Sequence, residues 1–392
     1  MSARAAPPTT ASPTASKAPA ALRRPQERRA VALAAPVAVL VVIGLGAVMS
    51  SSSVVAIRDG LDQYAIFERQ LLFVAIGIAA MIMTTKIPYQ AYARWAPLIL
   101  MVAIGGLVAT RLVGTERGGS RSWIEIGAFT VQPAEFAKFA VVTYLAAVLA
   151  RKEGYLGQFS HVALPVIGSL GVASALVMLQ PDLGTTILIV VAAFAVILAS
   201  AAPVRHVAAL GLVSLGGAVF LAKAAPYRWE RLTAWFDRTT PDILGAGLQV
   251  HQAKLALGSG GLFGVGLGAS RARWSFLPNA HTDFIFAIIG EETGLAGSLT
   301  VILFFVFFTV VGAVVAMRAP DSFGRLLAIG LVTWLSFQAI VNIGGVVEAL
   351  PITGVPLPFI SVGGSAMIVN LAVVGVLLNI ARSGVEPPAR RS

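Results

Sequence analysis

Long apolar stretches alternate with short polar segments along the chain. Each stretch can supply the roughly 17–25 residues that a tilted helix needs to cross the hydrocarbon of a bilayer, the fourth with its charged ends snorkelling. The pattern predicts an all-α polytopic membrane protein with ten transmembrane helices across residues 31–383. The stretches with no or almost no charged side chain are 30–57, 70–85, 95–110, 136–150, 154–181, 183–204, 206–222, 293–317, 326–347 and 349–381.

Composition supports the membrane assignment. Hydrophobic residues make up 57% of the chain, charged residues only 12%, and the mean hydropathy is +0.83. A soluble domain carries about 25% charged residues. The net charge of +11 comes with no basic face interleaved with aromatic residues, so we do not expect a nucleic acid partner. The absence of cysteine excludes disulfides, thiol catalysis and cysteine-ligated metals.

Basic residues in the short connections set the expected orientation. Residues 1–30 are rich in Ala, Pro, Ser and Thr with scattered Arg, which predicts a disordered basic tail. Lys86, Arg94 and Arg318 lie in connections that share a side with this tail, so the positive-inside rule makes that side cytoplasmic. We therefore expect both termini, including a short tail at 384–392, in the cytoplasm. A large extracytoplasmic loop, about 225–282, then separates helices seven and eight.

An acidic residue lies where this loop meets the eighth apolar stretch. Asp283 is costly to bury near lipid and is therefore a functional candidate by default. Its neighbours Phe284 and Phe286 would raise its affinity for a proton, which tunes a carboxylate as a base near neutral pH. Two alternatives remain open: Asp283 caps a helix, or it binds a metal with His281. Mg²⁺ or Mn²⁺ shared with a phosphate would need only one or two carboxylates.

Other polar segments suggest further contacts. Arg117 and Arg121 in a glycine-bearing outer loop suit phosphate or pyrophosphate, although with Trp123 they also fit anchoring to lipid headgroups. Glu135 and Lys138 fall on one helix face, either at the site or as a structural ion pair.

Two more segments leave two interpretations each. Asp182 either caps the helix that follows it or acts as a second acid. The glycine-rich run 258–268 is either a flexible backbone that can come close to a ligand or a plain re-entrant turn.

Five ordered motifs together resemble the SEDS family (shape, elongation, division and sporulation), the FtsW and RodA peptidoglycan polymerases. The resemblance covers about residues 37–382, and the segments 267–271 and 276–281 look more like the FtsW branch. The motifs are Gly-x-Glu-Arg…Arg-x-Trp-Ile at 114–124, Gln-Pro-x-Glu-x-x-Lys at 132–138, Gln-Pro-Asp-Leu-Gly-Thr at 180–185, Leu-Pro-x-Ala-His-Thr-Asp-Phe-Ile-Phe at 277–286, and Leu-Pro-x-Thr-Gly-x-Pro-Leu-Pro-Phe-Ile-Ser-x-Gly-Gly-Ser at 350–365.

This resemblance implies a glycosyltransferase that polymerises lipid II at the outer face of the bacterial cytoplasmic membrane. The family's catalytic aspartate falls on Asp283, with a divalent cation as the one cofactor to consider. We expect substrate contacts from the motifs and from the long loop. The candidates are Arg117, Arg121, Trp123, Glu135, Lys138, Gln249, Gln252, His281, Thr282, Ser361 and Ser365.

The resemblance also implies partners and a place in the cell. The expected partners are a class B penicillin-binding transpeptidase, divisome proteins and membrane lipids, and the expected location is the division septum. A RodA-like elongation polymerase, a flippase for lipid-linked precursors and a scaffold for the transpeptidase remain alternatives.

Overall fold

The computed structural model describes residues 20–117, 120–127, 129–223, 246–274, 277 and 280–384. The expectations for residues 1–19, for residues 224–245 of the long loop and for residues 385–392 lie outside this part of the chain.

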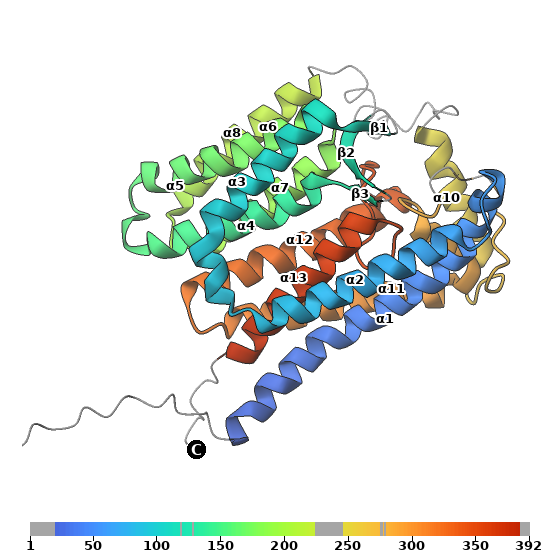
Figure 1. Cartoon of the computed structure of the whole chain (residues 1–392), viewed down its shortest axis with the longest axis horizontal. Coiled ribbons are helices and arrows are strands. Elements are labelled where there is room, and N and C mark those ends of the chain that lie inside the picture. The colour runs from blue at the N-terminus through green and yellow to red at the C-terminus, as the bar shows by residue number, and fades with distance from the viewer. Residues whose placement is uncertain are drawn as a thin grey trace, which may run out of the picture.

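Helices dominate the described residues, as the apolar pattern predicted (Figure 1). Eight helices there are long and apolar enough to cross a membrane, and two shorter apolar ones, Leu183–Ala199 and Val204–Phe220, accompany them. The fifth span is built from α5, a π-helical turn η2 and α6. The bounds are α1 Ala20–Arg58, α2 Ala65–Lys86, α3 Tyr89–Val113, α4 Pro133–Arg151, α5 Phe159–Val166, η2 Ile167–Gly171, α6 Val172–Met178, α7 Leu183–Ala199, α8 Val204–Lys223, α10 Ala246–Gly260, α11 Ile285–Met317, α12 Ser322–Val346 and α13 Gly364–Ser383, with a short 3₁₀ turn at Glu153–Tyr155.

The first helix starts earlier than expected. Helix α1 begins at Ala20, so the prediction of disorder is wrong for residues 20–30. This segment contains Ala, Leu, Gln, Glu and Arg, which favour a helix, and it lengthens α1 at its N-terminal end. Gln26 Nε2 donates to the carbonyl of Gly384 at 2.8 Å, so the start of α1 lies beside the end of α13.

A small antiparallel sheet lies between α3 and α4, where the sequence analysis expected only a loop. Strand β2 (Ser120–Ile126) pairs with β1 (Thr115–Arg117) on one side and β3 (Phe129–Val131) on the other. Gly127 has φ 61° in the tight turn between β2 and β3, a conformation that favours glycine. Alternating Trp-Ile-Glu-Ile and Phe-Thr-Val around that turn were the signal of a hairpin.

The glycine-rich run packs against a kink in α11. Gly294 has φ 70° and ψ −164°, which breaks the helix, and the N–H groups of Val265 and Gly266 donate to the carbonyls of Glu291 and Glu292 at 2.9 and 3.1 Å. A Cβ on Gly264 would lie 2.1 Å from the Glu292 carbonyl oxygen, so only glycine fits this approach. The run thus forms a turn that holds the helix, and its close approach to a ligand stays a prediction.

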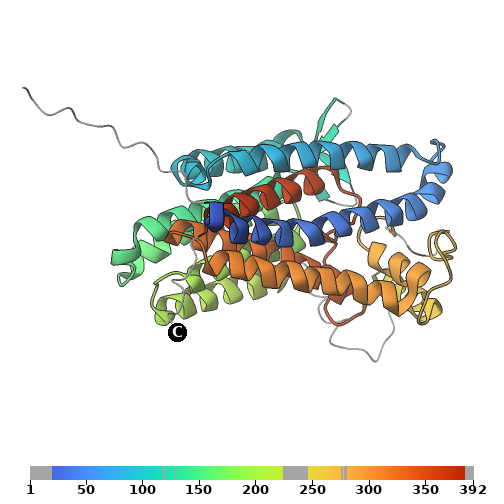
Figure 2. The ribbon, with the colours of Figure 1, turned by 90° about the horizontal axis from the view of Figure 1, so that it is seen from below.

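The two ends of the bundle differ. Strands β1–β3, helix α10 and the segment 347–363 gather at one end, called here the loop-rich end, whereas the start of α1 and the end of α13 lie at the other (Figures 1 and 2). Helices α4 and α12 are the most buried spans, with 78% and 72% of their apolar windows inside the protein. The buried core of the bundle therefore surrounds α4 and α12.

Candidate active site

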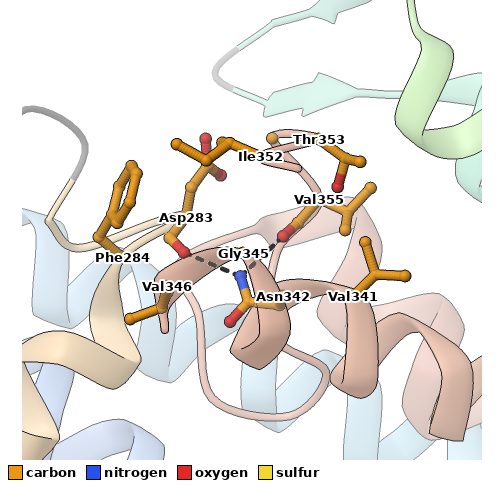
Figure 3. Close-up of a pocket in the computed structure, with 10 residues that line it drawn as sticks. Asp283, Phe284, Val341, Asn342, Gly345, Val346, Ile352, Thr353 and Val355 are labelled. Carbon is orange, nitrogen blue, oxygen red and sulfur yellow. Dashed lines mark hydrogen bonds between the residues drawn. The ribbon is translucent and has the colours of Figure 1, made fainter. Parts of the chain in front are cut away.

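Asp283 lies at the loop-rich end, just before the first turn of α11. Its partly exposed side chain borders a small pocket between the start of α11, the end of α12 and the segment 352–355 (Figure 3). Gly354 has φ 72°, and a Cβ there would lie 3.7 Å from Asp283 Oδ2. The backbone of the proline-rich segment thus approaches the carboxylate closely.

Side chains from two elements fix the backbone around Asp283. The Asn342 side-chain amide donates from Nδ2 to the carbonyls of Asp283 and Val355, both at 2.8 Å (Figure 3). Ser361 Oγ donates to the Thr282 carbonyl at 2.6 Å, and the N–H of Val362 donates to the His281 carbonyl at 3.1 Å. Residues 281–283 are therefore held to the segment 355–362 by two direct hydrogen bonds and by the bridge through Asn342.

Partial burial raises the proton affinity of Asp283. Loss of water around the side chain, and then the negative charge of Asp182, raise the pKa of Asp283 from 3.8 to about 7. Asp182 caps α7, where it accepts from the Thr185 N–H at 2.9 Å, so the capping interpretation of Asp182 holds and its charge also acts on the site. A carboxylate with a pKa near 7 can take a proton from a substrate and return it at neutral pH.

His281 has a different character from Asp283. Burial lowers the pKa of His281, a shift that nearby Asp59 opposes and Arg58 adds to. Its buried Nδ1 has no hydrogen-bond partner among the described residues. Within the same part of the chain, no three His, Asp or Glu side chains are grouped as a metal site would require. The lowered pKa favours the neutral form of the His281 ring.

Glu135 and Lys138 face each other in the core, away from the residues that line the pocket. Lys138 Nζ lies 2.8 Å from Glu135 Oε1, and both side chains are at most 3% exposed. Lys138 Nζ also donates to Gln338 Oε1 at 3.1 Å and lies 4.8 Å from the centre of the Trp334 ring. Gln338 Nε2 in turn donates to the Pro356 carbonyl at 2.8 Å. Hydrogen bonds thus connect the ion pair through Gln338 to the Pro356 carbonyl, two residues after Gly354 in the segment that borders the pocket.

The predicted contacts in the sheet lie at the same end of the molecule. Arg121 is exposed on β2 and Trp123 is half-buried there, while Arg117 belongs to β1 and its side chain lies outside the described part. Ser120 and Ser122 donate from Oγ to the Gln180 carbonyl, which attaches the sheet to the turn that carries Asp182.

The remaining candidates hold the framework or lie at its rim. Ser361 Oγ accepts from the Leu357 N–H, and Ser365 Oγ accepts from the Gln132 N–H and donates to the Thr130 carbonyl, both at 3.1 Å. Gln249 and Gln252 are half-buried on α10. This helix is tied to the segment 347–363 by the ion pair between Lys254 Nζ and Glu348 Oε2 at 2.5 Å.

Sequence reasoning missed Asn342, whose side chain links the backbone of Asp283 to that of Val355 across the pocket. The available signal was a carboxamide inside an apolar stretch, since a polar side chain within a span faces the protein interior and needs a partner. Asn342 is only 5% exposed, and its Oδ1 has no hydrogen-bond partner in the described part of the chain.

Known proteins resemble this chain over most of its length. The family model described as cell cycle protein, which spans FtsW, RodA and SpoVE, matches residues 31–385. Stage V sporulation protein E of Bacillus subtilis is 40% identical over 345 residues, which cover 88% of this chain and 94% of that protein. The probable peptidoglycan glycosyltransferase FtsW of Bacillus subtilis is 38% identical over 363 residues, which cover 88% of each chain.

Solved structures share the fold. One chain of a peptidoglycan synthase complex, studied for how polymerization and crosslinking are coordinated, superposes with a TM-score of 0.69 and 27% identity, covering 89% of this chain and 96% of that one. The rod shape determining protein RodA of Thermus thermophilus gives a TM-score of 0.64 and 25% identity, covering 91% and 98%.

Fold and site together define the class: a multi-span helical membrane protein of bacteria with a carboxylic acid of raised pKa in a pocket at one end of the bundle. The chain belongs to the FtsW, RodA and SpoVE family, as the five motifs predicted.

Proposed function

We propose that this protein is a peptidoglycan glycosyltransferase that polymerises lipid II into glycan strands, with Asp283 as the general base. The observation that carries the proposal is the Asp283 carboxyl group, with a pKa of about 7, bordering a pocket at the loop-rich end. Relatives named probable peptidoglycan glycosyltransferase FtsW support it.

The proposed chemistry transfers one glycosyl group. Asp283 takes the proton from the 4-hydroxyl of the acceptor sugar, and that oxygen attacks the anomeric carbon of the donor. The new C–O bond forms as the bond from the anomeric carbon to the diphosphate breaks, and undecaprenyl diphosphate leaves. Stabilising that leaving charge and holding two lipid-tethered substrates in line supply the rest of the rate enhancement.

The remaining predicted contacts belong to this proposal as binding residues. Arg117, Arg121 and Trp123 would meet the diphosphate, and Gln249 and Gln252 would meet the sugars from α10. In the alternative to the base role, a magnesium or manganese ion, when bound, would be held by Asp283 with substrate phosphate oxygens and would offset the charge of the leaving group, since magnesium needs only one or two protein carboxylates.

The direct test uses the purified chain with a class B penicillin-binding transpeptidase from the same bacterium and lipid II in detergent. We expect glycan strands on a gel. Movement of lipid II across proteoliposome membranes without any polymer would support the flippase alternative and overturn the proposal.

We also propose septal synthesis rather than side-wall elongation, together with divisome partners, because FtsW and the sporulation protein are among the relatives at 34–40% identity. A fluorescent fusion should gather at the division site. A fusion spread evenly along the side wall would indicate the RodA-like role instead.

Ten spans with both termini in the cytoplasm complete the proposal, and the loop-rich end then faces outward. The cysteine-free chain permits single-cysteine labelling without background. In spheroplasts, an impermeant maleimide should label Leu61→Cys, because Leu61 is 53% exposed at the loop-rich end. Val204 is 78% exposed at the opposite end, so Val204→Cys should be labelled only after permeabilisation. The reverse pattern would place Asp283 on the cytoplasmic side and remove the proposed reaction.

Activity should depend on pH through Asp283. The base acts when ionised, so kcat/KM should rise with pH and reach half its plateau near pH 7, the pKa of Asp283. Asp182→Asn removes a negative charge that raises this pKa and keeps a side chain able to cap α7. The midpoint should therefore move to lower pH in this variant. An unmoved or higher midpoint would show that Asp182 does not act on the base.

A further inference from the structure

A buried carboxylate in α11 takes no part in the proposed reaction. Glu291 lies about two helical turns after Asp283, just before the kink at Gly294. It is only 3% exposed. A carboxylate buried to this degree is costly unless hydrogen bonds satisfy it, so its partners show what it holds in place.

Three successive residues of the chain that leads to Asp283 donate to this carboxylate. Ser270 Oγ donates to Glu291 Oε2 at 2.5 Å, and the Arg271 N–H donates to Oε1 at 3.0 Å. The Ala272 N–H donates to Oε2 at 3.2 Å. Hydrogen bonds to a carboxylate are roughly twice as strong as bonds between neutral groups. We call these four residues the Glu291 clamp.

The Glu291 clamp closes a loop that carries Asp283. Beyond Ala272 the chain passes through Asp283 into α11 and returns to Glu291, so the clamp ties the two ends of residues 272–291 together. Holding both ends of a loop restricts the conformations of everything between them. The helical side of the loop starts at Ile285, which is fully buried, so a shift at the clamp is passed along a packed helix toward Asp283.

The residue after Glu291 has a different partner. Ser50 Oγ of α1 donates to Glu292, and Arg273 Nη1 donates to the Ser50 carbonyl at 3.1 Å. Glu292 is 4% exposed and thus as buried as Glu291, but this hydrogen bond attaches it to α1. Two neighbouring carboxylates of equal burial therefore hold different parts of the chain, and one can serve as the control for the other.

The direction of the Asp283 side chain depends on how its backbone is fixed. The Asn342 amide reaches the main-chain carbonyl of Asp283 at 2.8 Å, which leaves the carboxylate available to the pocket. The segment 355–362 fixes this backbone from one side. The Glu291 clamp fixes the ends of the same loop from the other side.

We propose that Glu291 is a positioning residue for the reaction, because the clamp sets where Asp283 stands relative to the acceptor hydroxyl. Glu291 itself touches no substrate in this assignment and acts only through Asp283. The inference rests on the proposed function, since it gives Glu291 a role in the reaction that Asp283 serves.

The test replaces the carboxylate by an amide of the same shape. In either orientation the NH₂ group of Glu291→Gln faces a backbone N–H, that of Arg271 or that of Ala272, so one donor loses its acceptor. We expect kcat to fall by about 10–100-fold with KM within about twofold, because a displacement of about 1 Å at a reacting group can cost that much. Glu292→Gln keeps an oxygen for Ser50 and should stay within about twofold of the unmodified chain.

The pH profile separates positioning from a general loss of folded protein. A loosened loop lets water reach Asp283, which weakens the desolvation that raises its pKa, while the charge of Asp182 is unchanged. The midpoint of kcat/KM should therefore move below pH 7 in Glu291→Gln and stay in place in Glu292→Gln. A smaller amount of folded enzyme would lower the rate without moving the midpoint.

Hydrogen exchange measured by mass spectrometry reports on the clamp without any reaction. In Glu291→Gln the amides of 271–274 and 281–283 should exchange about tenfold faster or more than in the unmodified chain, because the loop ends are no longer tied. In Glu292→Gln these amides should exchange as in the unmodified chain. If exchange responds in this way but the unmodified chain makes no polymer, the clamp stands as the anchor of the loop and the proposed function fails.

Three results would overturn the positioning role. They are an unmodified rate in Glu291→Gln, a lower kcat with the midpoint still at about pH 7, and equal effects of Glu291→Gln and Glu292→Gln. Ser270→Ala gives a second variant should Glu291→Gln not fold, because it removes one donor and leaves both backbone bonds to the carboxylate. It should lower kcat and the midpoint in the same directions by smaller amounts, and no change in either would count against the clamp.

Discussion

Asp283→Asn should abolish polymerisation of lipid II, with kcat lower by about 10²–10⁴-fold, the usual contribution of a general base. The asparagine has the same shape but cannot accept the proton of the acceptor hydroxyl at neutral pH. The contacts that hold this residue in place use its main-chain carbonyl, which receives the Asn342 side-chain amide at 2.8 Å. The substitution should therefore leave the pocket and the binding of lipid II nearly unchanged.

A matched control removes a different carboxylate from the same end of the molecule. Glu348→Gln neutralises a side chain that is 35% exposed and paired with Lys254, a surface ion pair worth at most about 1 kcal/mol. Its polymerisation rate should stay within about twofold of the unmodified chain, since a surface ion pair contributes so little to holding α10 and the segment 347–363 together. If Asp283→Asn has the unmodified unfolding temperature and also the unmodified rate, Asp283 is not the base.

The sequence could predict the helices because a bilayer leaves the backbone few choices. Every N–H and C=O in the hydrocarbon must be paired within its own segment, so a long apolar stretch becomes a helix. The sheet β1–β3 lies between two spans, where water can serve the backbone and this constraint is absent. Its strands, of three and seven residues, carry only a short alternating pattern. Strand predictions there depend on the glycine turn and not on hydropathy.

The candidate site was predictable at Asp283 and not at Asn342, for a related reason. A charge at the edge of an apolar stretch stands out in any sequence. The role of a single side-chain amide in such a stretch depends on its hydrogen-bond partners, and those of Asn342 are 59 and 13 residues away in the sequence. The same holds for Gln70, which bonds to backbone 291 and 293 residues away. The tertiary fold, and not local spacing, decides which buried amides serve the site.

The second large effect concerns the buried ion pair of α4. Lys138→Met should lower the free energy of unfolding by about 3–5 kcal/mol, because it leaves the Glu135 carboxylate buried without its partner. The pair is at most 3% exposed, so water cannot replace the lost ammonium. Thermal unfolding in detergent measures the change. Lys254→Met is the control on a pair 50% and 35% exposed, and should cost less than about 1 kcal/mol.

The double change Glu135→Leu with Lys138→Met then separates structure from function. It removes both charges, and replacing a buried pair by apolar side chains is often neutral or stabilising by about 1–4 kcal/mol. Gln338 keeps its bonds to Trp334 Nε1 at 2.9 Å and to the Pro356 carbonyl at 2.8 Å, so the backbone near Gly354 stays in place. A stable and active double variant would show that the ion pair has a structural role only. A stable but inactive one shows that these buried charges are needed for the reaction. Equal losses of stability in Lys138→Met and Lys254→Met would contradict the expected cost of breaking a buried pair.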